Sequence, residues 1–524
     1  MGWAAAPQKR DQMVLFSSRL EDAIAADHSV RLLDEILGRL DWSEWEATYH
    51  GHRGQPPIHP RVLASVILHG LLTHVRSSRR LEEALIVRLD FLWLAEGRTI
   101  DHTTLSEFRR KHPDRLRELF VQIGCLAREL GWLPLQTLAY DGTRIRANNR
   151  LHGSRTPAQW RALQAELRQK FKELTAQLEA EDSREAEVFG AGSASRLPSE
   201  LSDLQQRAQR VEAVLAELQR VSEAGETLPR RIPGTDPQSR VSPNKEGGFA
   251  PNYTPLVTVD ADQGFIVADD VSAMTNEDVH LVTQLERVQA DFGLPSPVPE
   301  ALADSAMCSG ANLEALAARG ITLYSPLPQT TTRSASPALR ADLTQPVPEA
   351  DWDRLPVIGG PSPQLHRDAF VYDAEHDCYW CPQGKELPAV HTTSQRRGTA
   401  RVQRTRYKAD AAACAVCPLL ARCVRAGTKR REISRDQHEA HRERLAARMA
   451  TREAQTKYER RREVAERPFA MIKQHFGVRR FLLRGLESVR QEWRWLTTAF
   501  NLHRMMALWH TRAGPLLTPV AAHL

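Results

Sequence analysis

The 524-residue chain lacks any long, uninterrupted apolar run. Its longest apolar stretch, residues 62–75, is interrupted by His69 and His74 and is shorter than the roughly 20 residues that a membrane-spanning helix needs. The first residues, MGWAAAPQKRDQ, also lack the basic-then-apolar order of a secretory signal. We therefore expect a soluble protein of the cytoplasm, without a membrane partner.

Cysteine is scarce as well, with seven residues. In a cytoplasmic protein, so few cysteines argue against disulfides and for metal binding or packing. Cys125 and Cys308 are isolated, and we expect them to be small buried apolar residues. The other five lie in DCYWCPQGKE and CAVCPLLARC, and they are Cys378, Cys381, Cys414, Cys417 and Cys423. Four thiolates can form a tetrahedral structural Zn²⁺ site, and spacing alone favours the two Cys-x-x-Cys pairs as its ligands.

Charge is unevenly distributed, although the net charge of the chain is only +6. Residues 396–512 carry 29 Lys and Arg against 11 Asp and Glu, which gives +18 there and leaves −12 on the rest. This asymmetry favours the docking of a polyanion, with phosphates as the target, although solvated helix faces are the alternative. Trp493 and Trp495 of this basic third could grip DNA, but core packing is the favoured interpretation.

Length and pattern together predict several domains. The chain is too long for one ordinary domain, and its 41% hydrophobic content is enough for more than one core. Apolar residues recur at helical steps from about residue 20 to 131. Residues 136–147 instead predict a strand, and further strand and helix signals over about 255–326 predict a mixed α/β sheet. Two apolar helical stripes within about 157–222, separated by a Gly- and Ser-rich segment, predict an inserted helical hairpin.

A basic helix near the end of the N-terminal helical region is a candidate for DNA contact. The segment DHTTLSEFRRKH carries Arg109, Arg110 and Lys111 after two other short predicted helices. Such an order is typical of a helix-turn-helix-like reader, and an ordinary helical bundle with basic surface residues explains it equally well.

Three acidic residues are candidates for binding divalent metal ions. Asp141 and Asp304 each end an apolar predicted strand, where side chains open into the cleft outside a sheet. Glu466 lies four residues after Arg462 and seven before Lys473, so the three share one face if their helix is continuous. Carboxylates hold Mg²⁺, and two such ions can activate water and stabilise the leaving oxygen during phosphodiester cleavage.

Five segments occur along the chain in an order typical of one known family. GQPPIHPRVLASVILHGLLTHVRSSRRLEE with DHTTLSEFRRKH comes first, then YDGTRIRAN with Asp141, then TDPQSRV with GGFAPNYTPLVTVD. ALADSAMCSGANLEAL with Asp304 and YERRREVAERPFAMIK with Glu466 complete the series. From roughly residue 10 to 510, the chain resembles bacterial insertion-sequence transposases of the DDE type, which have an RNase H-like catalytic fold.

The resemblance implies roles for individual residues. It implies that two Mg²⁺ or Mn²⁺ ions are held by Asp141, Asp304 and Glu466. It also implies that the DNA end is contacted by Tyr458, Arg462 and Lys473. Tyr458 stands one residue farther from Arg462 than in the commonest form of the family, and Ser-Ala-Met follows Asp304 where many relatives have Ala-Gly-Tyr. Pro468 is expected to begin or kink the helix after Glu466.

The resemblance also implies which cysteines bind zinc and where the domains of the chain begin and end. It favours Cys381, Cys414, Cys417 and Cys423 as zinc ligands, with Cys378 as the alternative. We expect a helical DNA-binding domain at 1–131, the first part of an RNase H-like core at 132–326, a cysteine-rich insertion at 327–450 and final core helices at 451–524.

These features predict a Mg-dependent DNA transposase of a bacterial insertion sequence. It would bind the terminal inverted repeats of its element as double-stranded DNA, cut them and join their 3′-hydroxyls to target DNA, as a homodimer or larger assembly close to the nucleoid. An RNase H-like nuclease or domesticated relative that cuts without integrating is one alternative. A non-enzymatic regulator that binds zinc and DNA is the other.

Overall fold

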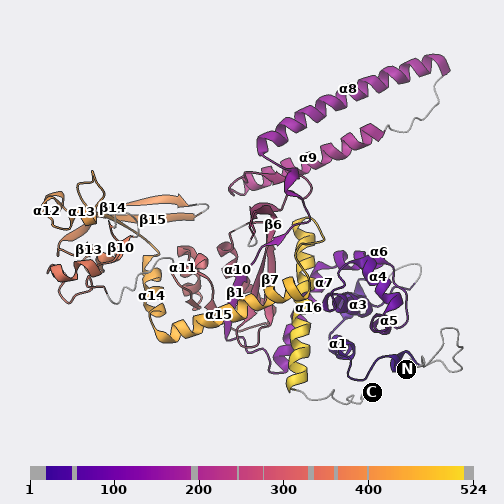
Figure 1. Cartoon of the computed structure of the whole chain (residues 1–524), viewed down its shortest axis with the longest axis horizontal. Helices are drawn as coiled ribbons and strands as arrows, with labels where there is room; N and C mark the ends of the chain where they lie inside the picture. Colours follow the sequence, from indigo (N-terminus) through magenta and orange to yellow (C-terminus); the bar gives the residue numbers. More distant parts are fainter. Residues whose placement is uncertain are drawn as a thin grey trace, which may run out of the picture. The chain divides into compact units, whose positions relative to one another are not determined.

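The computed structural model describes residues 19–49, 56–189, 199–244, 247–274, 276–327, 336–358, 364–397 and 400–512. The two ends of the chain, most of the Gly- and Ser-rich segment between the predicted hairpin helices and part of the proline-rich break after residue 326 lie outside these ranges. The chain divides into two compact units (Figure 1). The first comprises Met1–Pro134, Asp262–Val271 and Arg467–Leu524, and the second comprises Leu135–Ala261 and Ser272–Glu466.

The first unit is mainly helical, which confirms the prediction for the N-terminal region. Helix α3 begins at Pro60, whose fixed φ suits a first helical position. The carboxylate of Asp101 accepts hydrogen bonds from the N–H groups of Thr103 and Thr104 and so caps α6. The elements of this unit include η1 (Leu20–Ala23), α1 (Ser29–Gly38), α2 (Ser43–Ala47), α3 (Pro60–Leu72), α4 (Ser78–Val87), α5 (Leu89–Leu94), α6 (His102–Lys111), α7 (Pro113–Glu129), β7 (Ile266–Ser272), η8 (Met471–His475) and α16 (Leu486–Arg512).

The C-terminal helix α16 packs against α3 and α7. The side chains of Trp493 and Trp495 are buried, and the indole N–H of Trp495 donates to the backbone oxygen of Arg109 at 3.3 Å. Arg76 and Glu492 form a largely buried ion pair at 2.9 Å in the same unit. The interpretation of the two tryptophans as core residues is therefore confirmed.

A mixed sheet forms the centre of the second unit. Strand β1 is antiparallel to β6 on one side and parallel to β8 on the other, and β9 is parallel to β8. The order is β2-β6-β1-β8-β9, which confirms the predicted mixed α/β architecture. Its strands are β1 (Thr137–Gly142), β2 (Ile145–Arg146), β5 (Arg240–Pro243), β6 (Phe249–Asp260), β8 (Glu300–Leu302) and β9 (Thr322–Tyr324). Around them lie η2 (Leu151–Gly153), β3 (Ser154–Arg155), β4 (Ile232–Pro233), η3 (Asp278–His280), α10 (Leu281–Asp291), η4 (Ser305–Met307) and α11 (Gly310–Ala318).

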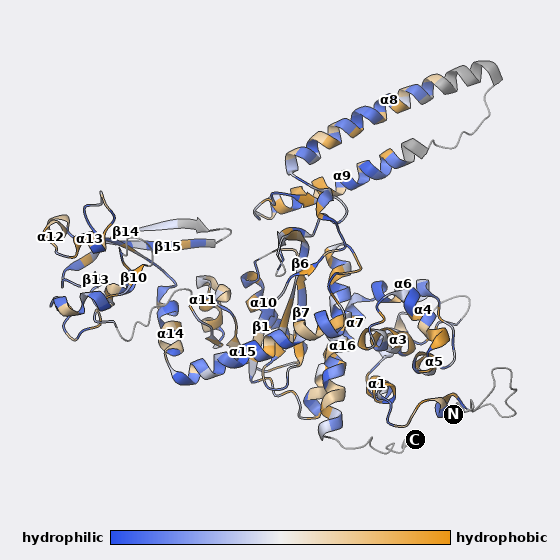
Figure 2. Cartoon of the chain, viewed as in Figure 1, coloured by the Kyte–Doolittle hydropathy of each residue, from blue (hydrophilic) through white to orange (hydrophobic). Residues whose placement is uncertain are grey.

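Two long helices, α8 (Pro157–Phe189) and α9 (Ser199–Glu223), stand between β3 and β4 in the chain. They pack against each other through a small cluster that includes Trp160, Val211 and Val214. Hydrophilic residues predominate along both helices (Figure 2). Their apolar seam is therefore narrow, as expected for two helices that mainly cover each other.

The cysteine-bearing part of the second unit has its own sheet, ordered β12-β13-β14-β15-β16. Its elements are η6 (Glu349–Arg354), β10 (Val357–Ile358), β11 (Gln364–Leu365), η7 (Arg367–Ala369), β12 (Val371–Asp373), β13 (Cys378–Trp380), β14 (Glu386–Arg397), β15 (Ala400–Lys408), α12 (Ala411–Ala415), α13 (Leu420–Cys423) and β16 (Glu432–Asp436). Its buried core includes Leu355, Phe370, Tyr379 and Tyr407. We call this part of the chain the cysteine module.

Two helices follow the module, α14 (Glu439–Met449) and α15 (Arg452–Ala470). Pro468 lies inside α15, so the helix does not begin there, and a π-helical turn follows at once. In that turn the N–H of Phe476 donates to the oxygen of Met471, five residues back, at 3.0 Å. Among the residues described, no helix has the length and apolar character needed to cross a bilayer.

Candidate functional site

Asp141 lies at the end of β1, after two fully buried residues, Ala139 and Tyr140. One carboxylate oxygen, Oδ1, accepts a hydrogen bond from the N–H of Gly142 at 2.9 Å and pairs with Nη2 of Arg461 at 2.9 Å. The side chains of Asp141 and Arg461 are only 15% and 12% exposed. The carboxylate of Asp141 is thus paired with a cationic side chain, the guanidinium of Arg461.

Asp304 lies two residues after the neighbouring strand, β8, and directly before η4. In the parallel pairing of β1 with β8, Ala139 stands opposite Leu302, and Asp141 and Asp304 each follow two residues later. The carboxylate of Asp304 caps η4 by accepting from the N–H of Ala306 at 2.8 Å. The carboxyl ends of parallel strands open at one edge, so the pairing register brings these two predicted residues together.

Helix α15 lies against this edge. Its small side chains allow a close approach in a buried cluster made of Ala139, Ala261, Leu302, Tyr324, Ala454 and Ala465. Lys457 pairs with the carboxylate of Glu300 on β8, and a guanidinium N–H of Arg460 donates to the backbone oxygen of Ala261 at 3.1 Å. Apolar and ionic contacts together therefore fix the helix that follows the cysteine module onto the sheet.

Tyr458 and Arg461 are the residues of α15 that interact with the two aspartates. Burial raises the pKa of Tyr458, the Arg461 guanidinium lowers it and the Asp304 carboxylate raises it. Tyr458 therefore lies within electrostatic reach of Asp304 and of Arg461, the partner of Asp141. Arg461 was not among the sequence candidates, yet a signal was present, because it stands one residue closer to Tyr458 than Arg462 does.

Glu466 is the member of the predicted triad that the structure does not bring to the edge. Its side chain is exposed, and five residues separate it from Arg461, which is about 140° around a helix of 3.6 residues per turn. Within the described ranges, no group of three or more His, Cys, Asp or Glu side chains has the geometry of a metal site. The structure thus joins Asp141 with Asp304 and leaves Glu466 on the flank of α15.

A further carboxylate, Glu277, lies beside Gly142, the residue after Asp141. A Cβ atom built on Gly142 would collide with the carboxylate of Glu277. The hydroxyl of Tyr140 donates to the backbone oxygen of Glu277 at 2.8 Å, which holds this loop at the end of β1. No spacing or periodicity in the sequence links residue 277 to residue 142, so only the fold reveals this neighbour, which lies on the face of β1 opposite to the Asp141 side chain.

Four of the five clustered cysteines line one cavity of about 160 Å³, and they are Cys381, Cys414, Cys417 and Cys423. The N–H of Lys385 donates to Sγ of Cys381 at 3.3 Å, and the N–H of Leu419 does the same for Cys417. Such donors favour the thiolate. Burial raises the pKa of the Cys423 thiol to about 12. Cys378 is fully buried on β13 and does not line the cavity.

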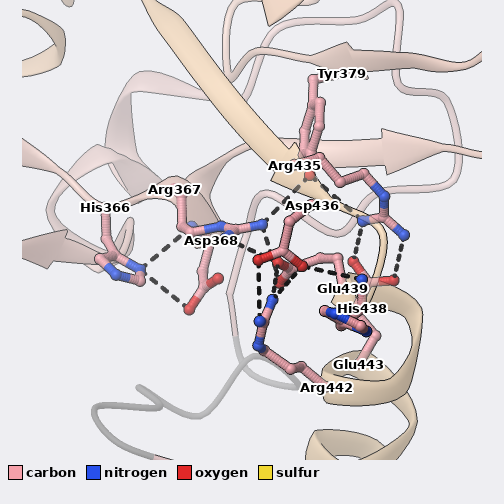
Figure 3. A network of polar contacts seen from close by, with 10 residues as sticks. All are labelled: His366, Arg367, Asp368, Tyr379, Arg435, Asp436, His438, Glu439, Arg442 and Glu443. Carbon is pink, nitrogen blue, oxygen red and sulfur yellow. Dashed lines mark hydrogen bonds and ion pairs between the residues drawn. The ribbon is translucent and has the colours of Figure 1, made fainter. Parts of the chain in front are cut away.

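A polar network joins the cysteine module to α14 (Figure 3). Arg435 on β16 makes two hydrogen bonds with Glu443, at 2.7 and 3.0 Å. Arg442 makes two with Asp436, at 2.8 and 3.0 Å. Paired bonds from a planar guanidinium fix orientation as well as distance. Because α14 leads directly to α15, the module is tied to the helix that carries Glu466.

The basic residues predicted on α6 have different environments. Arg109 is buried in the first unit, where burial lowers its pKa and its guanidinium donates to the backbone oxygen of Arg76 at 2.6 Å. Arg110 and Lys111 are exposed, and Lys111 pairs with Glu107 one turn earlier. The position of Arg109 in the core therefore leaves Arg110 and Lys111 as the DNA contact candidates on this helix.

The basic candidates around Glu466 are also separated. Arg462 is exposed on α15, whereas Lys473 is half-buried in the π-helical turn η8 of the first unit. The expected sharing of one face by Glu466, Arg462 and Lys473 assumed a regular helix. The widened turn after Pro468 removes that regularity for Lys473.

Comparison with known protein families gives two matches. Residues 18–111, which contain α1 to α6, match the family described as Transposase domain (DUF772). Residues 380–506 match the family described as Transposase DDE domain, and this range includes the cysteines of the cavity and Glu466 but neither Asp141 nor Asp304. No curated protein matches the chain.

Proposed function

Because the chain carries the domains of a DDE transposase, we propose that it cuts DNA at the ends of a mobile element and joins those ends to target DNA. The observation that supports the proposal is the register of β1 and β8, in which Asp141 and Asp304 each follow a directly paired residue, Ala139 and Leu302, by two positions. Helix α15, which carries Glu466, packs against β1, β8 and β9.

We propose that Asp141, Asp304 and Glu466 bind two Mg²⁺ or Mn²⁺ ions. Their carboxylate oxygens are the ligands that hard cations prefer, and the Arg461 guanidinium already stands as a cation at Asp141. Such ions supply an activated water and stabilise charge at phosphorus. Since Glu466 faces away from Arg461, its recruitment requires α15 to rotate or its local contacts to rearrange when DNA binds.

In this proposal Arg461 holds Asp141 in position in the free protein, and Tyr458 orients Arg461. When Asp141 takes a metal ligand role, the guanidinium is released toward the phosphate of the bound DNA, a group that arginine binds in two-pronged fashion. Exposed Arg462, together with Lys473, Arg110 and Lys111, would contact phosphates elsewhere on the duplex and position it.

The central order, with β6 antiparallel to β1 and with β8 and β9 parallel to it, supports an RNase H-like core built from 132–326 and 451–524. The four cavity cysteines would hold a structural Zn²⁺ in the 327–450 insertion. The 1–131 domain would bind the terminal inverted repeats, and an oligomer would pair the two ends.

The test is cleavage of a duplex that ends in the element's terminal repeat, with Mg²⁺ present. We expect the wild type to cut it, and Asp304→Asn to lose more than the roughly 100-fold that loss of an outer metal partner costs. Glu459→Gln, a change at an exposed carboxylate on α15, is the matched control and should cut as the wild type does. Equal cleavage by the wild type and Asp304→Asn, or none by either on the correct end, would refute the proposal.

A further inference from the structure

The hairpin of β14 and β15 has a one-sided charge composition. Between residues 387 and 409 the sequence contains five Arg and one Lys, and no Asp or Glu. Of the arginines whose side chains are described there, Arg401, Arg404 and Arg406 form no ion pair within the described part of the chain. Lys408 pairs with Glu432 on β16 at 3.2 Å, so the positive charge without an ion-pair partner in the described part of this hairpin lies on these arginines. We call residues 387–397 and 400–409 the basic ribbon.

The end of the basic ribbon has only two strands, whereas Arg404 and Arg406 lie where β16 also pairs with β15. Strand β13 pairs with β14 only up to Pro388, and β16 pairs with β15 only from Arg404 onward. From Ser394 to Arg397 on one strand and from Ala400 to Gln403 on the other, the ladder contains only β14 and β15. Figure 1 shows the two strands running side by side beyond the rest of the module's sheet.

Both faces of the basic ribbon present hydrogen-bond donors. Strand alternation places Arg404 and Arg406 on one face, with His391 paired opposite Arg406, and places the exposed Arg401 on the other. On that second face the hydroxyls of Thr392 and Thr405 share a hydrogen bond at 2.9 Å. A groove that encloses the ribbon would meet donors on either side.

We propose that the basic ribbon binds duplex DNA by entering its major groove between the two phosphate backbones. The major groove of B-form DNA, about 12 Å wide, admits a two-stranded β-ribbon. The deep, narrow major groove of duplex RNA does not. The one aromatic residue of the ribbon, Tyr407, is buried, so no stacking platform for single-stranded bases is present. This inference rests on the proposed function, and it gives the cysteine module a DNA contact of its own.

The test measures binding of the full chain, without divalent metal, to a duplex of arbitrary sequence. The combined variant Arg401→Gln, Arg404→Gln and Arg406→Gln should weaken binding on the order of tenfold, and the dependence of log affinity on log salt should become shallower by about two to three. The matched control combines Arg168→Gln, Arg207→Gln and Arg210→Gln, which removes the same charge from exposed positions on α8 and α9.

Each outcome decides the proposal. Loss of binding in the ribbon variant but not in the control, with recovery when the three arginines become lysines, supports it. Unchanged binding, equal weakening by both variants, or a loss limited to single-stranded DNA, duplex RNA or an acidic protein partner overturns it. The ribbon variant should still show Mg²⁺-dependent cleavage at saturating DNA, whereas Asp304→Asn should bind and not cut. Failure of the ribbon and failure of the proposed chemistry are therefore distinguishable.

Discussion

The cysteine cavity and the carboxylate edge belong to the same unit but are organised differently. At the cavity, four thiols line one space in a small apolar core, and backbone N–H groups point at two of the sulfurs. At the edge, Asp141 is paired with Arg461, Asp304 caps a short helix and Glu466 is exposed. The four thiols therefore lie around one space, whereas each of the three carboxylates has its own surroundings, and their contacts can be replaced by other partners.

The roles proposed for the two sites would account for this difference. A structural metal is part of the core of a small module, so its ligands must converge when the chain folds. A catalytic carboxylate must admit both ions and a charged substrate, so it is held beforehand by interactions that those partners can replace. If the comparison is right, substitutions at the cavity act on stability and those at the edge act on ion affinity and rate.

The largest expected effect is at the cavity, from Cys417→Ser. Zinc contributes about 10–16 kcal/mol of apparent binding free energy in small zinc domains, so loss of one thiolate should release the ion and unfold the cysteine module. Zinc content by mass spectrometry and thermal unfolding with and without a chelator measure this. Cys125→Ser on α7 is the control. If the wild type contains no zinc and its melting temperature is the same with and without the chelator, packing alone stabilises the cavity.

An intermediate effect on the free energy of unfolding is expected from a glycine-to-alanine substitution, made once in each region. Gly384, directly after the Cys381 turn, has a φ of +69°, and a Cβ there would collide with the backbone oxygen of Thr344. Gly384→Ala should therefore lower the free energy of unfolding by about 2–4 kcal/mol. A Cβ on Gly142 meets only the mobile end of Glu277, so Gly142→Ala should cost less than about 1 kcal/mol. Chemical denaturation of both variants checks the ranking, and equal costs would contradict it.

The smallest effect is expected from Arg461→Gln. Removal of the guanidinium frees Asp141 for a divalent ion, so affinity for Mn²⁺ should rise several-fold, as measured by calorimetry without DNA. Arg462→Gln removes the same charge from the same helix without touching Asp141, and it should change affinity less. A fall in Mn²⁺ affinity in Arg461→Gln would mean that the arginine supports the site rather than competing with the ion.

Several features were predictable because they depend on short stretches of chain. The strand before Asp141, the mixed sheet and the helical N-terminal region follow from the spacing of apolar residues. The burial of Trp493 and Trp495 was expected on other grounds, because large aromatic side chains usually pack in a core. Local capping and turn chemistry, as at Asp101 and Pro60, likewise need only neighbours in sequence.

Other features required contacts between distant segments. Arg461 and Arg462 are adjacent and chemically identical, and only the rotation of α15 on the sheet decides which of them reaches Asp141. Glu277 meets Gly142 across more than a hundred residues of intervening chain. Spacing alone favoured Cys378 as the fourth cysteine, whereas the fold lines the cavity with Cys423 and buries Cys378 on β13.

By itself, the sequence determined the types of element, the order of the acidic residues along the chain and the concentration of positive charge in its last third, because these depend on composition and periodicity. The tertiary structure alone decided that Asp141 and Asp304 follow neighbouring parallel strands, that Glu466 is exposed on α15 and that the end of the basic ribbon has only two strands. The reason is physical: strand register and helix rotation are set by the packing of residues far apart in the chain, and one residue of shift turns a side chain to the opposite face.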